Sequence, residues 1–252
     1  MFRLGVVSFL NALPLYATLR ERADIQIIPA LPARLADGLT AGTYDAALMP
    51  VVDHLRGVGD GLLGDAIVGA TGRVQSVMLF SNVPIQDVKS IALDTSSHTS
   101  VALTQVTARD FYGLNPQLIH HAPDLNAMLN VADSALLIGD PALIAMQNLG
   151  DLRVYDLAGQ WQKFTGLSFI FAAWAACAGL GNRDQLTQIL NRARDDGKAR
   201  IPEIVAAQTL PPQLSPAIVE DYLANIIDHR RTPSHGAGLE MFRRRLAKLD
   251  LL

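Results

Sequence analysis

The sequence predicts an α/β protein with two lobes and a ligand cleft between them. Three observations support this prediction. The first two-thirds of the chain alternates short apolar segments with helical ones, which is typical of α/β sheets. Two long apolar segments bracket a stretch that is itself a small α/β unit. The last seventy residues have helical periodicity only.

Taken in order, eight apolar segments predict strands, and helices are predicted between them. The strands are expected at residues 2–8, 25–30, 45–51, 75–81, 90–95, 117–122, 135–139 and 168–177, with helices at 12–21, 32–41, 99–112 and 141–148. We expect parallel strands joined by right-handed crossovers. After Gly181, Pro-rich or Gly-rich breaks separate three further predicted helices, at 183–208, 215–230 and 236–249.

The long apolar segments "VQSVMLFS" and "FIFAAWAACAG" are expected to be crossover strands between the lobes. On this interpretation lobe 1 is discontinuous and contains residues 1–82 and 173–252, including the C-terminal helices. Lobe 2 is an inserted unit of residues 83–172. Because domain interfaces are favoured ligand sites, the cleft between the lobes is the expected binding site.

Composition excludes several classes of function. Half of the chain is hydrophobic, 18% is charged and the net charge is −3, so we expect a folded globule with no nucleic-acid partner. The single Cys177 and the absence of zinc-type spacing predict neither disulfide nor metal. The longest apolar run, residues 167–180, is shorter than the ~20 residues that span a bilayer. We expect no membrane partner and a cytoplasmic location, with a periplasmic one as the alternative.

Polar residues collect where predicted strands meet helices, which is where open α/β sheets bind ligands. Ser8 and Asn11 follow the first strand, and Asn11 either caps a helix or stands in the cleft. In "DTSSHTS", hydroxyl side chains crowd the start of the helix predicted at 99–112. They could be simple caps, but their number favours a cradle for a carboxylate or phosphate. These hydroxyls belong to Ser96, Ser97, Thr99 and Ser100.

Two further residues are candidates for the cleft. Asp140 precedes Pro141 and either caps a helix or acts in the site. Ser76 lies in a predicted crossover, where a buried hydroxyl must be hydrogen-bonded and a ligand contact is equally plausible.

Six motifs, in this order, resemble the chorismate dehydratase family of the futalosine route to menaquinone. They are "GVVSFLNALPLY", "VQSVMLFS", "ALDTSSHTSVALT", "HAPDL", "ALLIGDPAL" and "VYDLAGQWQKFTGLSFIFAAWA". The similarity covers most of residues 3–178 and is loose over the C-terminal helices. It implies a two-lobed fold like that of type II periplasmic binding proteins, which agrees with the expected lobes.

The resemblance implies a lyase that removes water from chorismate to give 3-[(1-carboxyvinyl)oxy]benzoate without metal or organic cofactor. Asn11 matches the family's proposed catalytic position. Other matching positions imply contacts to this dicarboxylate substrate, namely Ser76, Thr95, Ser97, Thr99 and Ser100. The matching motifs lack Glu, Lys and Cys, so no conventional base is evident. We therefore expect Asn11 to orient the substrate and its leaving hydroxyl while a substrate carboxylate takes the proton, with Asp140 as the competing base.

Two other functions stay open. The first is a solute-binding protein that captures a small carboxylate, which usually requires a signal peptide or lipid anchor. The second is the related dihydroxynaphthoate synthase of the same pathway, which would be expected to use a catalytic histidine. Only His98, His120 and His121 lie near the expected cleft.

Overall fold

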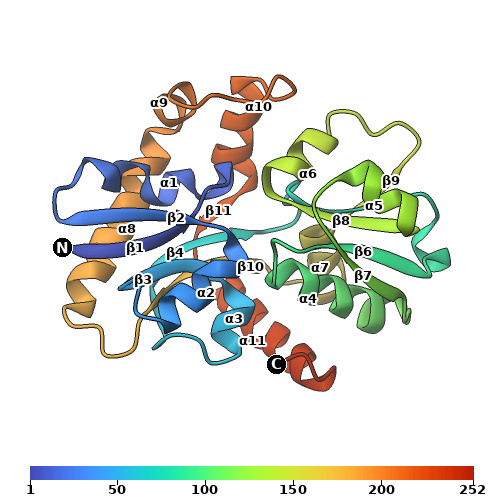
Figure 1. The fold of residues 1–252 in the computed structure, drawn as a ribbon, viewed down its shortest axis with the longest axis horizontal. Helices are drawn as coiled ribbons and strands as arrows, with labels where there is room; N and C mark the ends of the chain where they lie inside the picture. Colours follow the sequence, from blue (N-terminus) through green and yellow to red (C-terminus); the bar gives the residue numbers. More distant parts are fainter.

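The computed structural model describes all 252 residues and contains two mixed sheets in two lobes (Figure 1). The first sheet has the order β11-β4-β10-β3-β1-β2. Its strands are β1 (Phe2–Val7), β2 (Ile25–Ala30), β3 (Ala46–Pro50), β4 (Leu62–Ala70), β10 (Phe169–Ala176) and β11 (Asp228–Arg230). The second sheet has the order β7-β6-β8-β5-β9. Its strands are β5 (Val77–Ser81), β6 (Ser90–Asp94), β7 (Gln117–His121), β8 (Ser134–Ile138) and β9 (Arg153–Asp156).

Helices surround each sheet, as Figure 1 shows. In the first lobe these are α1 (Leu13–Tyr16), α2 (Pro32–Thr40), α3 (Val51–Leu55), α8 (Arg183–Ala199), α9 (Ile201–Ala206), α10 (Pro216–Asp221) and α11 (Pro233–Lys248). In the second they are α4 (Thr99–Val106), α5 (Leu125–Val131), α6 (Gly139–Ala145) and α7 (Leu157–Thr165). Short 3₁₀ turns flank α1 at Leu10–Ala12 and Ala17–Glu21, and a third spans Ile85–Asp87. Single π turns follow α4 at Thr107–Phe111 and α10 at Tyr222–Ile226. No helix is both long enough and apolar enough to cross a membrane.

The predicted α/β class and two-lobed architecture are confirmed, but the expectation of parallel strands is only partly right. Strands β1, β2 and β3 are parallel to one another, as are β6, β7 and β8. Strand β10 is antiparallel to β3 and β4, and β5 is antiparallel to β8 and β9. Strands β5 and β10 are the first strands after the two passages between the sheets. Each therefore begins on the cleft side of its sheet and runs away from the cleft. Their direction is therefore opposite to that of the strands beside them.

The two expected crossover strands lie next to the passages, and each pairs within one sheet only. The chain passes between the sheets at residues 71–76, after β4, and at 157–168, which include α7. The lobe boundaries at 82/83 and 172/173 stay predictions.

All eight predicted strands are present, and three more were missed because their patterns are short or interrupted. Strand β4 contains Gly64 and Gly69, and β9 has four residues. Residues 228–230 were predicted as helix, but they form β11 against β4, a partner far away in the sequence. The helix predicted at 183–208 is two helices, because Pro202 lies in the first turn of α9.

The C-terminal helices pack against the first lobe through apolar residues at helical spacing. Helix α8 buries Leu186, Leu190 and Ala193 on one face. Near its end a Cβ on Gly197 would lie 1.9 Å from the carbonyl oxygen of Pro14, so α8 and α1 approach as closely as they do only with glycine there. This contact holds the segment after β1 in place, and that segment carries part of the candidate site.

Candidate active site

A pocket of about 540 Å³, counting the space at its mouth, lies where the two lobes meet. Both sheets contribute to it, as do the passage after β4 and the loops at the cleft ends of β1, β3, β6 and β8. The lining residues are Val7, Phe9, Asn11, Pro32, Leu48, Pro50, Val68, Val74, Ser76, Val77, Ser97, Thr99, Ser100, Ile138, Gly139, Phe171 and Ala172.

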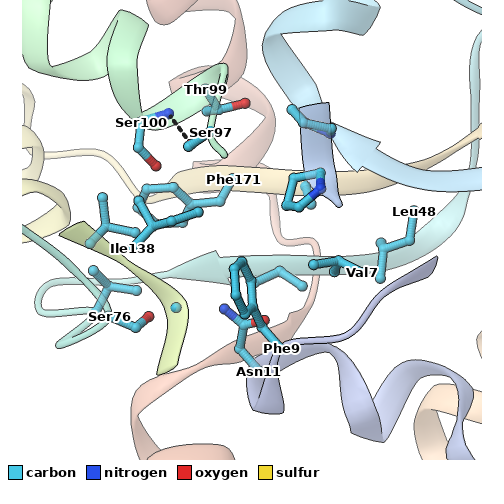
Figure 2. Close-up of a pocket in the computed structure, with 17 residues that line it drawn as sticks. Val7, Phe9, Asn11, Leu48, Ser76, Ser97, Thr99, Ser100, Ile138 and Phe171 are labelled. Carbon is cyan, nitrogen blue, oxygen red and sulfur yellow. Dashed lines mark hydrogen bonds between the residues drawn. The ribbon is translucent and has the colours of Figure 1, made fainter. Parts of the chain in front are cut away.

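One side of the pocket is a hydroxyl wall, formed by Ser97, Thr99 and Ser100 at the start of α4 (Figure 2). The oxygens of two of these groups accept hydrogen bonds within the protein. The Ser100 backbone N–H donates to Ser97 Oγ at 3.1 Å, and the Val52 N–H donates to Thr99 Oγ1 at 3.2 Å. The hydroxyl protons of Ser97 and Thr99 are still available as donors. Ser97 therefore satisfies one backbone N–H in the first turn of α4, and the wall presents donors where the helix dipole favours an anion.

The turn before the hydroxyl wall is shaped by Asp94, the last residue of β6. Its buried carboxylate accepts from the backbone N–H and hydroxyl of Ser96, at 2.9 and 2.5 Å, and from the Ile138 N–H at 3.3 Å. Burial raises the pKa of this carboxyl, and the bonds to Ser96 and Ile138 oppose that rise. The same bonds turn the Ser96 side chain toward Asp94.

The opposite side is an amide wall, formed by Asn11 and Ser76, and Figure 2 shows both residues across the pocket from the hydroxyl wall. The capping interpretation of Asn11 is wrong: the residue lies inside the 3₁₀ turn Leu10–Ala12, which has no side-chain cap. Two residues from the C-terminal part of the chain lie against this wall. The Tyr222 hydroxyl donates to Ser76 Oγ at 2.6 Å, and His229 Nε2 is 2.8 Å from the carbonyl oxygen of Asn11.

Ser76 is placed by a strained turn. Gln75 has a φ of +58°, a left-handed conformation that is uncommon for any residue other than glycine. The turn is held by Asp156, whose carboxylate accepts from the Val74 and Gln75 N–H groups, both at 2.8 Å. Asp156 also caps α7 through the Gly159 N–H at 3.0 Å. A single half-buried carboxylate therefore holds the passage between the lobes next to Ser76.

Between the two walls the pocket is apolar. Phe171 and Ile138 lie between the hydroxyl and amide walls in Figure 2, and the remaining lining is largely aliphatic. No Lys, Arg, His, Asp or Glu side chain lines the pocket. Gly139 has a φ of +61°, and a Cβ there would lie 2.8 Å from the Phe9 ring, so only glycine lets this ring lie against β8. The arrangement suits a flat apolar ring with polar groups at its two ends.

The structure brings together five of the nine residues predicted for the site: Asn11, Ser76, Ser97, Thr99 and Ser100. The other four lie outside the pocket lining. Ser8 and Thr95 are exposed and line neighbouring hollows, and Ser96 is bonded to Asp94. Asp140 contacts the backbone next to Asn11.

Asp140 does not cap its own helix, so this interpretation of the residue is also wrong. Its carboxylate instead accepts from the Leu10 N–H at 3.1 Å, across the cleft and next to Asn11. Burial raises the pKa of Asp140 to about 6. The group thus has a pKa suited to acid–base chemistry, although it does not line the pocket.

At the opposite edge of the pocket, other polar contacts join the two lobes. His98 Nδ1 lies 2.9 Å from the carboxylate of Asp53, which is in α3 of the first lobe. This contact raises the pKa of His98. The Val52–Thr99 hydrogen bond lies beside it. The pocket is therefore enclosed by polar contacts at both edges.

Sequence reasoning missed Tyr222, His229 and Asp156. Tyr222 and His229 fall where the family resemblance is loose, and each contacts a residue far away along the chain. The only available signal was indirect: polar side chains in otherwise apolar segments. No group of three or more His, Cys, Asp or Glu side chains is arranged to hold a metal ion.

The chain is similar in sequence to proteins of one known family. A family model described as "Menaquinone biosynthesis" matches residues 2–248. The chorismate dehydratase of Thermus thermophilus is 31% identical over 255 aligned residues, which cover 95% of this chain and 93% of that protein. The chorismate dehydratase of Campylobacter jejuni is 26% identical, with 98% of each chain covered.

Solved structures share the fold at low sequence identity. Protein AF1704 from Archaeoglobus fulgidus has a TM-score of 0.80 at 14% identity, covering 100% of this chain and 98% of that one. The periplasmic aliphatic sulphonate binding protein SsuA from Escherichia coli has a TM-score of 0.67 at 17% identity, covering 100% and 88%. The fold is thus that of the two-domain periplasmic binding proteins.

Proposed function

The chain belongs to the menaquinone biosynthesis family, and from that premise we propose that it is a chorismate dehydratase, a hydro-lyase of menaquinone biosynthesis. The proposed product is 3-[(1-carboxyvinyl)oxy]benzoate. A cytoplasmic location and the futalosine route, both expected from the sequence, belong to the same proposal.

The observation that supports this proposal best is the polarity of the pocket. Chorismate is a six-membered ring that carries one carboxylate directly. A second carboxylate belongs to an enolpyruvyl group, which is joined to another ring carbon through an ether oxygen. The apolar middle of the pocket suits the ring, and the hydroxyl and amide walls offer hydrogen-bond donors at opposite ends. Donors in an enclosed site bind charge more strongly than they would in water, because the local dielectric is low. The dianion would therefore be held by dipoles and not by formal cations.

The proposed reaction is an elimination that makes the ring aromatic. A base removes the proton from the ring carbon that bears the ether oxygen. The electron pair of that C–H bond forms the new ring double bond, and hydroxide leaves the adjacent ring carbon. Proton and hydroxide together account for the water lost. Asn11 is proposed to donate its amide N–H to the departing hydroxyl, because an amide stabilises charge but is too weak a base to take the proton.

The proposed base is a carboxylate of the substrate, because no protein carboxylate lines the pocket. Asp140 is the competing base, with its pKa of about 6 and its position next to the Asn11 turn. The Asp140→Asn variant separates the two: turnover persists if the substrate supplies the base. Loss of turnover with chorismate binding retained would favour Asp140.

The direct test is to mix the purified protein with chorismate and record the ultraviolet spectrum over time. The proposal predicts a growing benzoate absorbance and one product equivalent per chorismate consumed. Binding without a spectral change would instead support a carboxylate-binding protein, the function suggested by the fold of SsuA. The dihydroxynaphthoate synthase alternative is disfavoured because no histidine lines the pocket.

A further inference from the structure

One short C-terminal segment, residues 222–229, contacts both residues of the amide wall. It begins with the π turn Tyr222–Ile226 and ends in β11. π turns are rare and often occur at functional sites. Both polar side chains that this segment directs toward the pocket region are buried, Tyr222 at 2% and His229 at 1% exposure. Each contacts a residue of the amide wall.

The direction of the Tyr222–Ser76 hydrogen bond decides what Ser76 can do. Burial, together with the negative charge of Asp140, raises the pKa of Tyr222 far above its usual range, so the hydroxyl stays a phenol that donates to Ser76 Oγ. Ser76 makes no side-chain hydrogen bond to another protein acceptor. Its own proton is therefore free to point into the pocket that it lines.

His229 acts on the main chain of Asn11. A carbonyl oxygen can only accept, so the 2.8 Å contact places the imidazole proton on Nε2. Burial lowers the pKa of His229 to about 4, which keeps the ring neutral near pH 7. Its Nδ1 is buried without a partner, so the ring is held in place by packing and by this one bond.

We propose that residues 222–229 are the positioning element of the active site, with Tyr222 orienting the side chain of Ser76 and His229 fixing the main chain of Asn11. This inference rests on the proposed dehydratase function and assigns Tyr222 and His229 no contact with the substrate. It predicts that the amide wall loses its orientation when either contact is removed.

The first test is a double-mutant cycle on chorismate turnover. Tyr222→Phe keeps the ring and removes one oxygen, and we expect kcat to fall about tenfold with KM changed less than threefold. Because Tyr222 acts through Ser76, the Tyr222→Phe/Ser76→Ala double variant should be within threefold of Ser76→Ala alone. If Tyr222→Phe damaged the structure independently of Ser76, the kcat losses of the two single variants would multiply in the double variant. Tyr155→Phe is the matched control, since it removes a hydroxyl that accepts from the Ile85 N–H outside the pocket.

The second test uses rescue at His229 and remains informative if Tyr222→Phe fails to fold. Glutamine carries an N–H at the end of its side chain and leucine does not, so His229→Gln should retain kcat within threefold while His229→Leu loses about tenfold. Multiplicative losses in the cycle, an undiminished Tyr222→Phe variant or equal losses at His229 would overturn the inference. An inactive wild-type protein would instead overturn the proposed function, and this inference with it.

Discussion

The two walls of the pocket are built in different ways. The hydroxyl wall is local: Ser97 and Ser100 bond to each other three residues apart, and Asp94 bonds to Ser96 two residues away. The amide wall is assembled over long sequence separations, since 146 residues separate Ser76 from Tyr222 and 218 separate Asn11 from His229. We propose that the two walls have different roles: the hydroxyl wall binds an anion, and the amide wall acts on the reacting atoms.

The largest expected effect lies on the amide wall. Asn11→Ala should lower kcat about 10²–10³-fold, because it removes a donor directed at the departing hydroxyl. Product formation from chorismate, followed by absorbance, measures this. Asn148→Ala, an exposed change on the second lobe, is the control. Wild-type turnover in Asn11→Ala would remove the amide wall from the chemistry.

Two groups that contact the main chain at or next to Asn11, the half-buried Asp140 and the buried His229, should titrate with opposite effects on stability. The folded-state pKa of Asp140 is raised to about 6, so its ionisation destabilises the fold by up to about 3 kcal/mol as pH rises from 4 to 6.5. The folded-state pKa of His229 is lowered to about 4, so stability is lost as pH falls through the same range. In the wild-type protein the two contributions largely cancel.

Variants at either position should separate these contributions in urea unfolding measured at several pH values. Relative to wild type, the free energy of unfolding of Asp140→Asn should increase by up to about 3 kcal/mol between pH 4 and 6.5. That of His229→Gln should increase relative to wild type as pH falls over the same range. Parallel pH profiles for all three proteins would show that neither group is buried as described.

On the hydroxyl wall the expected effect is smaller and falls on binding. Ser100→Ala should raise KM about tenfold and leave kcat within threefold, because the lost hydrogen bond serves ground state and transition state alike. Steady-state kinetics measure the split. Thr209→Ala, which removes an exposed hydroxyl far from the pocket lining, is the control. If Ser100→Ala lowered kcat and left KM unchanged, the proposed difference in role between the two walls would be contradicted.

The smallest expected effect is at the edge of the cleft. The His98–Asp53 contact joins the lobes, but the His98 side chain is 38% exposed. We expect His98→Asn to lower stability by less than about 1 kcal/mol, and the loss to shrink further in high salt. Urea unfolding at two salt concentrations checks this. A loss of several kcal/mol that does not depend on salt would mean that the contact is more important than its exposure suggests.

The same difference between the walls explains what could be predicted from the sequence. Ser97, Thr99 and Ser100 form a local motif at a strand-to-helix turn, and their place there follows from general rules. Asn11 and Ser76 were found as polar residues next to strands, although the proposed capping role of Asn11 was wrong.

Tyr222, His229 and Asp156 could not be found in this way. Each is defined by a partner more than eighty residues away, and a pattern within one segment carries no information about such a partner. The strand β11 was missed for the same reason, because its pairing with β4 outweighs the helical pattern around Asp228. The α/β class and the lobes were easier to predict, since they depend on patterns repeated along the whole chain.

The most direct test of the account is a crystal structure of the protein with 3-[(1-carboxyvinyl)oxy]benzoate bound. The account predicts the aromatic ring beside Phe171, one carboxylate on the hydroxyls of residues 97–100, and the ether side facing Asn11 and Ser76. A ligand seated outside this pocket, or one whose carboxylates are bound mainly by arginine or lysine side chains, would contradict it.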